Sequence, residues 1–205
     1  MLKCLKCLNV KMEKGFSLIE LLVVVAVIVI LSTLVFSDYS KGGKKMALER
    51  AAQRLSQDIR KTQEMAMSAY QPSDICNGTP GNLKGFGIHF DESSGNEKKY
   101  IIFAECNDTE PNYDYDGDGP DDVKEGWSVD IEKGIKISDI EKDDLSNGST
   151  YPTTLSVVSI PPDPTIYIAS SSSGYEAIIT LCIEDSCATD YKKIKVNNAG
   201  RIKVE

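Results

Sequence analysis

The stretch "GFSLIELLVVVAVIVILSTLVF", residues 15–36, decides the fold, because from Phe16 to Phe36 it holds a single ionisable side chain, Glu20. A helix rising about 1.5 Å per residue would extend roughly 32 Å over this run, close to the thickness of a bilayer's hydrocarbon core. We therefore expect a transmembrane helix over residues 16–37. A carboxylate inside such a helix needs a partner, and its own segment offers none. The alternative is that Glu20, five residues into the run, reaches the water at the headgroups.

The residues before the apolar run form a basic leader. Residues 1–15 hold four Lys against one Glu, which favours a cytoplasmic N-terminus. An ordinary secretory signal has its cleavage site after the apolar region, whereas here the candidate junction, between Gly15 and Phe16, lies before it. Cleavage at this junction would leave the apolar helix attached to the mature chain.

The run Lys14-Gly15-Phe16-Ser17-Leu18-Ile19-Glu20 resembles the class III leader of type IV prepilins and type II secretion pseudopilins. The resemblance implies that a prepilin peptidase cuts after Gly15, that the new N-terminal Phe16 is methylated, and that Glu20 acts in assembly. It also implies a bacterial inner-membrane protein with a cytoplasmic N-terminus and a periplasmic or extracellular domain, which later joins a fibre. The amine of Phe16 on a neighbouring subunit is a cation that a buried Glu20 could meet.

Charge and cysteine content limit the classes of function. The net charge is −8, and about −11 without residues 1–15, which disfavours generic nucleic-acid binding. Residues 105–144 hold fifteen of the thirty-one acids against four Lys. Four cysteines lie beyond the apolar run, and in an exported domain they predict disulfides with three possible connectivities. The pair nearest in sequence is Cys182 with Cys187, which leaves Cys76 with Cys106.

The pattern after the apolar run predicts a second helical half and then strands. Leu48, Ala52, Leu55, Ile59, Thr62, Ala66 and Ala69 recur at helical spacing, and Pro72 is expected to end the helix. Gly42 and Gly43 predict a kink or a melted turn. Beyond Pro72 the period falls to two, which predicts strands at 85–90, 99–105, 127–137, 165–170, 175–183, 191–197 and 200–205.

We therefore predict an α+β fold, in which a long N-terminal helix packs on a C-terminal antiparallel β-sheet domain. The expected parts are a leader (1–15), a transmembrane and assembly helix (16–37), an amphipathic helix (38–71), and a β domain (72–205) with an acidic loop (106–126).

The amphipathic helix, the strands around Gly174 and the closing hairpin "KIKVNNAGRIKV" resemble the GspH/FimT pseudopilin family. The resemblance implies a non-enzymatic structural subunit, a minor pilin or pseudopilin, that assembles with other pilin or pseudopilin subunits. The alternative is a minor pilin that binds DNA during uptake. Its candidate contacts are the cations of the closing hairpin, namely Lys192, Lys193, Lys195, Arg201 and Lys203.

The segment "DYDGDGPDDVKE", residues 114–125, fits the calcium-loop template D-x-D-x-D-G-x5-E. Calcium takes six to eight oxygen ligands, and alternate Asp side chains followed by Gly can supply them from one bend. The expected ligands are Asp114, Asp116, Asp118, Pro120 through its carbonyl, Asp122 and Glu125. The alternative is a solvated acidic surface loop.

Catalytic chemistry is not indicated by the sequence. His89, the chain's one histidine, lies in a strand pattern between Ile88 and Phe90, so we expect a structural role for it. No Ser, Cys or Lys stands in a recognisable nucleophile motif.

Overall fold

A computed structural model describes residues 15–68, 76, 83–106, 113–115, 122–123, 128–161, 165–169 and 171–205, with backbone alone for 34–41 and 122–123. The chain divides into two compact units, Met1–Gly42 and Gly43–Glu205, and each is described by itself.

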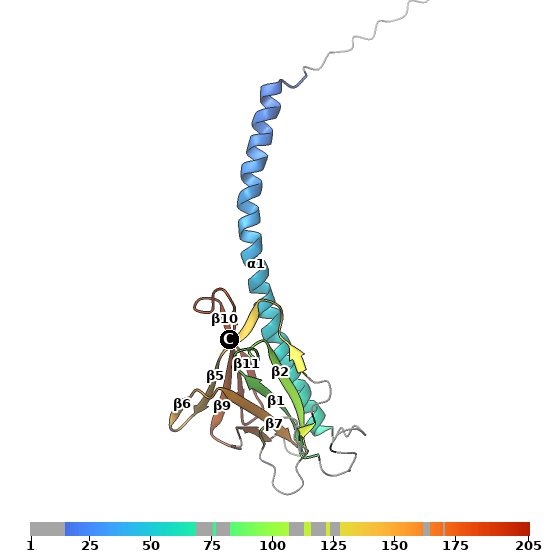
Figure 1. Cartoon of the computed structure of the whole chain (residues 1–205), viewed down its shortest axis with the longest axis vertical. Coiled ribbons are helices and arrows are strands. Elements are labelled where there is room, and N and C mark those ends of the chain that lie inside the picture. Colours follow the sequence, from blue (N-terminus) through green and yellow to red (C-terminus); the bar gives the residue numbers. More distant parts are fainter. Residues whose placement is uncertain are drawn as a thin grey trace, which may run out of the picture. The chain divides into compact units, whose positions relative to one another are not determined.

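The N-terminal part of the fold is one long helix, α1 (Leu18–Met67), drawn in blue to green in Figure 1. The helix runs without a break through Gly42 and Gly43, so the expected melted turn is wrong. Each glycine costs about 1 kcal/mol relative to Ala, yet it keeps its N–H, and the series of helical hydrogen bonds can continue through both. The helix ends at Met67, four residues before the predicted end at residue 71.

The amphipathic stripe of the second helical half is confirmed. Leu48, Ala52, Leu55, Ile59, Thr62 and Ala66 are all buried, and Ala69 lies outside the described residues. The hydroxyl of Thr62 donates to the carbonyl oxygen of Ile59 at 2.7 Å, so this polar group is buried without an unsatisfied donor. The stripe therefore places one face of α1 against the strands.

The fold is α+β, as predicted, but α1 packs on two antiparallel sheets where one was expected. One sheet has the order β3-β2-β1-β7-β8, with β4 also paired to β2, and the other has the order β11-β10-β9-β5-β6. The strands are β1 (Gly85–Asp91), β2 (Lys99–Glu105), β3 (Asp122–Val123), β4 (Ser128–Asp130), β5 (Ile135–Asp144), β6 (Gly148–Thr150), β7 (Thr154–Ile160), β8 (Thr165–Ile168), β9 (Tyr175–Ile183), β10 (Tyr191–Asn197) and β11 (Ile202–Val204).

The predicted strand at 127–137 is wrong as a single element. It is divided into β4 and β5, which belong to different sheets, and Gly134 between them has φ +86°, a conformation that glycine adopts without strain. The prediction also missed β3, β6 and β7. Strand β7 is buried along most of its length and lies between β1 and β8.

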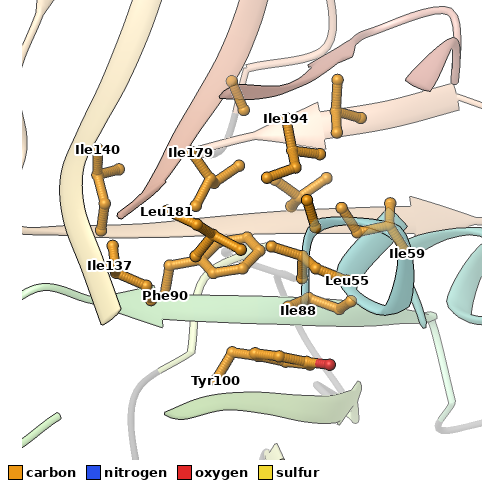
Figure 2. Packing of buried hydrophobic residues seen from close by; sticks show 14 of the residues in the cluster. Leu55, Ile59, Ile88, Phe90, Tyr100, Ile137, Ile140, Ile179, Leu181 and Ile194 are labelled. Carbon is orange, nitrogen blue, oxygen red and sulfur yellow. The ribbon is translucent and has the colours of Figure 1, made fainter. Parts of the chain in front are cut away.

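The main core fills the space between α1 and the two sheets. Figure 2 shows Leu55 and Ile59 of α1 beside Ile88 of β1, with Ile179 of β9 and Ile194 of β10 in the same cluster. All five side chains are buried. A second cluster joins Ala66 near the helix end to Cys76, Phe86, Ala104 and Cys106.

Two backbone positions are fixed by close packing. Gly87 of β1 lies between Phe103 of β2 and Val158 of β7, and a Cβ there would be 2.7 Å from the Phe103 ring and 2.9 Å from the Val158 methyl group. At Gly85 a Cβ would be 2.4 Å from the carbonyl oxygen of Ser159. Both sites therefore require glycine.

Asn198 connects the two sheets at the turn between β10 and β11. Its side-chain amide donates to the carbonyl oxygens of Ile166 (2.7 Å) and Ser171 (3.0 Å), and its amide oxygen accepts from the N–H of Tyr175 at 2.7 Å. Its backbone carbonyl accepts from the N–H of Ile166 at 3.2 Å. One residue thereby ties β8 of the first sheet to β9 and β10 of the second.

Candidate functional site

The first turn of α1 carries the candidate processing and assembly residues. Gly15 and Phe16 precede the helix and are exposed, which leaves the bond between them open to another protein. Ser17 caps the helix, because its Oγ accepts from the N–H of Glu20 at 3.2 Å. Residues 1–14 of the predicted leader lie outside the described residues.

Glu20 also fits a local sequence pattern that the sequence analysis missed. A Ser at the cap followed by a Glu three positions later is the capping-box pattern, and Ser17 and Glu20 occupy those two places. An acid in the first turn is also favoured by the positive end of the helix dipole. The signal S-x-x-E was present in the quoted segment. Any assembly role for Glu20 must therefore be separated from its effect on the helix end.

Apolar side chains surround Glu20 on α1 and are exposed throughout the described part, as at Leu18 (82%) and Ile19 (72%). Contiguous exposed apolar surface of this kind marks an interaction site or a membrane contact. In the described part of the chain, no helix is both long and apolar enough to cross a bilayer. The transmembrane segment 16–37 extends into residues whose side chains are not described, and it stays a prediction.

The acidic loop is described at its beginning and in β3. Of the expected calcium ligands, Asp114 is described and Asp122 lies in β3, where the backbone pairs with Glu105; Asp116, Asp118, Pro120 and Glu125 lie outside the described residues. Within the described residues no group of three or more His, Cys, Asp or Glu is placed to hold a metal. The calcium assignment stays a prediction.

Asp114 is held by a buried hydroxyl of the sheet. Ser156 Oγ on β7 donates to the Asp114 carboxylate and accepts from the Tyr115 N–H at 3.1 Å. His89 Nδ1 lies 2.9 Å from the same hydroxyl. The Ser156 hydroxyl therefore contacts the His89 ring, the Asp114 carboxylate and the Tyr115 backbone together.

His89 is buried within β1. Burial lowers its pKa, although Asp114 and Asp91 oppose this shift, so the ring is neutral near pH 7. The ring of Tyr115 packs on it at a centroid distance of 4.9 Å. His89 and Ser156 thus fix the beginning of the acidic loop on the sheet.

The cysteine pairing agrees with the expectation. Cys76 is bonded to Cys106, and Cys182 to Cys187, with sequence separations of 30 and 5. The longer bridge lies in the second buried cluster beside Ala66, so it fixes the segment after α1 to the end of β2.

The candidate DNA contacts of the closing hairpin are largely occupied by acids of the same chain. The ion pairs are Lys192 with Glu49 (3.3 Å), Lys193 with Glu141 (4.0 Å), Lys195 with Glu205 (3.0 Å), and Lys203 with Glu205. The structure therefore places these lysines beside carboxylates that offset their charge for an approaching phosphate. Arg201 is exposed, and the described residues give it no ion pair.

Comparison with known proteins identifies the N-terminal segment. Residues 10–36 match the family model described as the prokaryotic N-terminal methylation motif. None of the curated proteins matches the chain. Among solved structures, the minor pseudopilin EpsH from the type 2 secretion system of Vibrio cholerae aligns with a TM-score of 0.41 and 11% identity, covering 77% of this chain and 95% of that one. The methylation motif at the N-terminus and the long helix packed on antiparallel sheets behind it support the resemblance of the chain to type IV pilin-like proteins.

Proposed function

We propose that the chain is a structural subunit, a minor pilin or pseudopilin, of a type IV pilus or a type II secretion pseudopilus. The observation that carries the proposal is the methylation motif matched at residues 10–36. The exposed apolar side chains of the first half of α1 support it, because they offer a surface for lipid or for the helices of neighbouring subunits.

In this proposal a prepilin peptidase removes residues 1–15, and Phe16 becomes the methylated N-terminus of the mature chain. Residues 16–37 anchor the precursor in the bacterial inner membrane, with the N-terminus cytoplasmic and the second unit on the opposite side. Replacing Gly15 with Val should block maturation, because a branched side chain would obstruct cleavage next to Phe16. Mass spectrometry after co-expression with the peptidase measures this; a Gly15→Val chain shortened like the wild type would contradict the assignment.

Glu20 is proposed to act in assembly by pairing with the Phe16 amine of another subunit. Because Glu20 also stands in a capping box, the charge and the cap must be tested separately. Glu20→Gln keeps a residue that suits the capping box but removes the charge, whereas Glu20→Val removes both. Ser17→Ala is the matched control, since it removes the Oγ that caps the helix and keeps the carboxylate.

We expect both Glu20 variants to insert and be processed but to be absent from fibres, while Ser17→Ala is incorporated. Quantitative immunoblotting of sheared fibres against the membrane fraction measures incorporation. If Glu20→Gln enters fibres like the wild type and Glu20→Val does not, the capping role explains the residue and the ion-pair assignment is wrong.

We also propose that the acidic loop 114–125 binds calcium and thereby stabilises the exported domain. Support comes from the ligand spacing and from the contact between Asp114 and Ser156, which positions the first carboxylate of the template. Extracellular calcium modules often bind at about 10⁻⁴ to 10⁻³ M, so millimolar calcium is the relevant concentration.

A further inference from the structure

The two disulfides differ in their access to solvent. Cys76 and Cys106 are both buried, at 3% and 4% exposure, and Cys182 is fully buried. Cys187 is partly exposed. Thiol–disulfide exchange requires that a thiolate reach one of the two sulfurs, and Cys187 is the more exposed of the two residues in this bridge, so we expect a reductant in solution to attack there.

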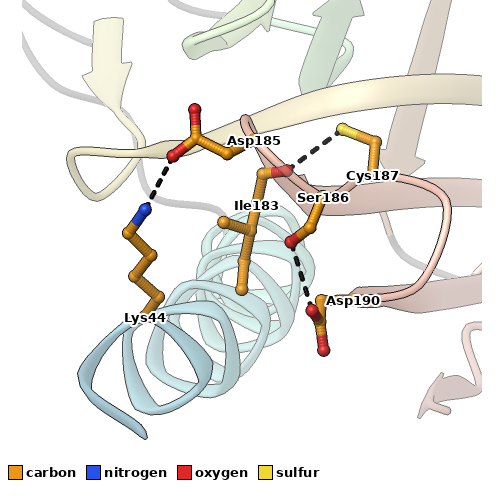
Figure 3. A network of polar contacts seen from close by, with 6 residues as sticks. All are labelled: Lys44, Ile183, Asp185, Ser186, Cys187 and Asp190. Atoms are coloured by element: carbon orange, nitrogen blue, oxygen red, sulfur yellow. Dashed lines mark hydrogen bonds and ion pairs between the residues drawn. The ribbon is translucent and has the colours of Figure 1, made fainter. Parts of the chain in front are cut away.

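The bridge between Cys182 and Cys187 closes a short, ordered loop after β9. The N–H of Ser186 donates to the carbonyl oxygen of Ile183 at 2.9 Å, and the N–H of Asp190 donates to that of Ser186 at 2.9 Å. Ser186 Oγ also donates to Asp190 Oδ2 at 3.1 Å, as Figure 3 shows. These contacts, together with the bridge, fix the positions of the loop's carboxylates.

Two of these carboxylates hold α1 at the beginning of the second unit. Lys44 Nζ lies 2.6 Å from Asp185 Oδ2, and Lys45 Nζ lies 3.0 Å from Asp190 Oδ1. Each lysine lowers the pKa of its partner carboxyl group. Exposed ion pairs are weak mainly because both side chains must be ordered, so a loop that is already ordered reduces that cost.

We propose that the Cys182–Cys187 loop is a redox-sensitive clamp on the first turn of the second unit's helix. With the bridge closed, Asp185 and Asp190 hold Lys44 and Lys45; with the bridge reduced, the loop and both ion pairs are released. The next contacts along the helix, Glu49 with Lys192 and Arg50 with Glu132, involve other elements. Ala47 and Leu48 are buried in the main core, so the release is confined to the turn of the helix that carries Lys44 and Lys45.

The proposed reducing agent is a dithiol, which supplies the electrons and protons that reduction of the bridge requires. Its thiolate attacks Cys187 Sγ, forms a mixed disulfide and displaces Cys182 as a thiolate, which takes up a proton. The second thiol then attacks the mixed disulfide, so that the dithiol becomes a cyclic disulfide and Cys187 is left as a thiol. Two electrons and two protons pass from the dithiol to the protein. The Cys76–Cys106 bridge serves as an internal reference because both of its sulfurs are buried.

The first test measures selectivity on the full chain in detergent micelles. The oxidised protein is titrated with dithiothreitol without denaturant, trapped with iodoacetamide and digested for mass spectrometry. We expect Cys182 and Cys187 to be alkylated at a dithiothreitol concentration about tenfold below that needed for Cys76 and Cys106. Simultaneous labelling of both pairs, or earlier labelling of the buried pair, would overturn the proposal.

The second test measures release by amide hydrogen exchange of the selectively reduced chain. Two exposed ion pairs together account for a change of about tenfold, so exchange in peptides covering residues 43–48 should rise by about that factor while residues 55–62 are unchanged. Lys44→Ala with Lys45→Ala should give the same rise with the bridge intact, and reduction should then add nothing. Arg60→Ala with Lys61→Ala removes the same charge from the same helix and should leave residues 43–48 unchanged. Exchange there that does not respond to reduction would disprove the clamp.

Discussion

Removing the Cys76–Cys106 bridge should destabilise the domain more than removing the Cys182–Cys187 bridge. The chain-entropy model relates the stabilisation to the length of the closed loop. For separations of 30 and 5 residues it gives about 3.6 and about 2 kcal/mol. The expected difference is therefore about 1.6 kcal/mol, apart from the small cavities left by Cys→Ala replacement.

The assay is urea unfolding of residues 43–205, the compact unit that contains every residue of both buried clusters. With a slope near 2 kcal/mol/M, the midpoint should fall by roughly 2 M for Cys76→Ala with Cys106→Ala, and by roughly 1 M for Cys182→Ala with Cys187→Ala. Circular dichroism follows the transition. An equal loss in both variants, or a larger loss from the short loop, would refute the loop-length argument.

Four further outcomes follow from the same structure. Gly87→Ala should lower stability by about 1–3 kcal/mol in urea unfolding, because its Cβ overlaps two buried neighbours, whereas Gly43→Ala, with open space around it, should not lower it. Millimolar calcium should raise the melting temperature over that in EDTA by several degrees, an effect that Asp116→Ala abolishes; equal melting in both would leave a solvated loop. DNA retention should be weak and lost by 200 mM salt, and tight binding that depends on Arg201 would instead favour the uptake function. Lys203 and Lys195 lower the pKa of Glu205 to about 2. The ion pairs of Glu205 should therefore stabilise the closing hairpin fully above about pH 4.5, and this stabilisation should be lost as the pH falls toward 2. Amide exchange in β11 measures the loss, and Glu205→Gln should remove the pH dependence.

Elements whose pattern arises from local burial were predicted well from the sequence. Strands β2, β9 and β10 have the predicted bounds, because each alternates or runs apolar between clear turn residues. The helical stripe from Leu48 to Ala66 was also predicted, since burial of one face gives the 3.6-residue period directly. The sequence left three disulfide connectivities open, and the observed one contains the pair nearest in sequence, Cys182 with Cys187.

The remaining features depend on contacts that a linear pattern does not contain. Strand β7 was missed because Ser156 and Ser159 interrupt its apolar residues, and their burial is explained only by tertiary structure. The division of 127–137 depends on Gly134 and on which sheet accepts each half. The anchoring of Asp114 by Ser156 joins residues 42 positions apart, and no local signal indicates it.

The hydrogen bonds of Asn198 affect whether another molecule of the protein can add a strand to the sheet at β8. An outer strand usually presents unpaired N–H and C=O groups, which invite a strand from another molecule to add to the sheet. On β8 the outward backbone groups of Ile166 are bonded to Asn198, and those of Ile168 are bonded to Ser171. This border of the sheet is therefore closed to strand addition. In a subunit proposed to polymerise through its helix, such closure prevents a competing, amyloid-like route of aggregation at β8.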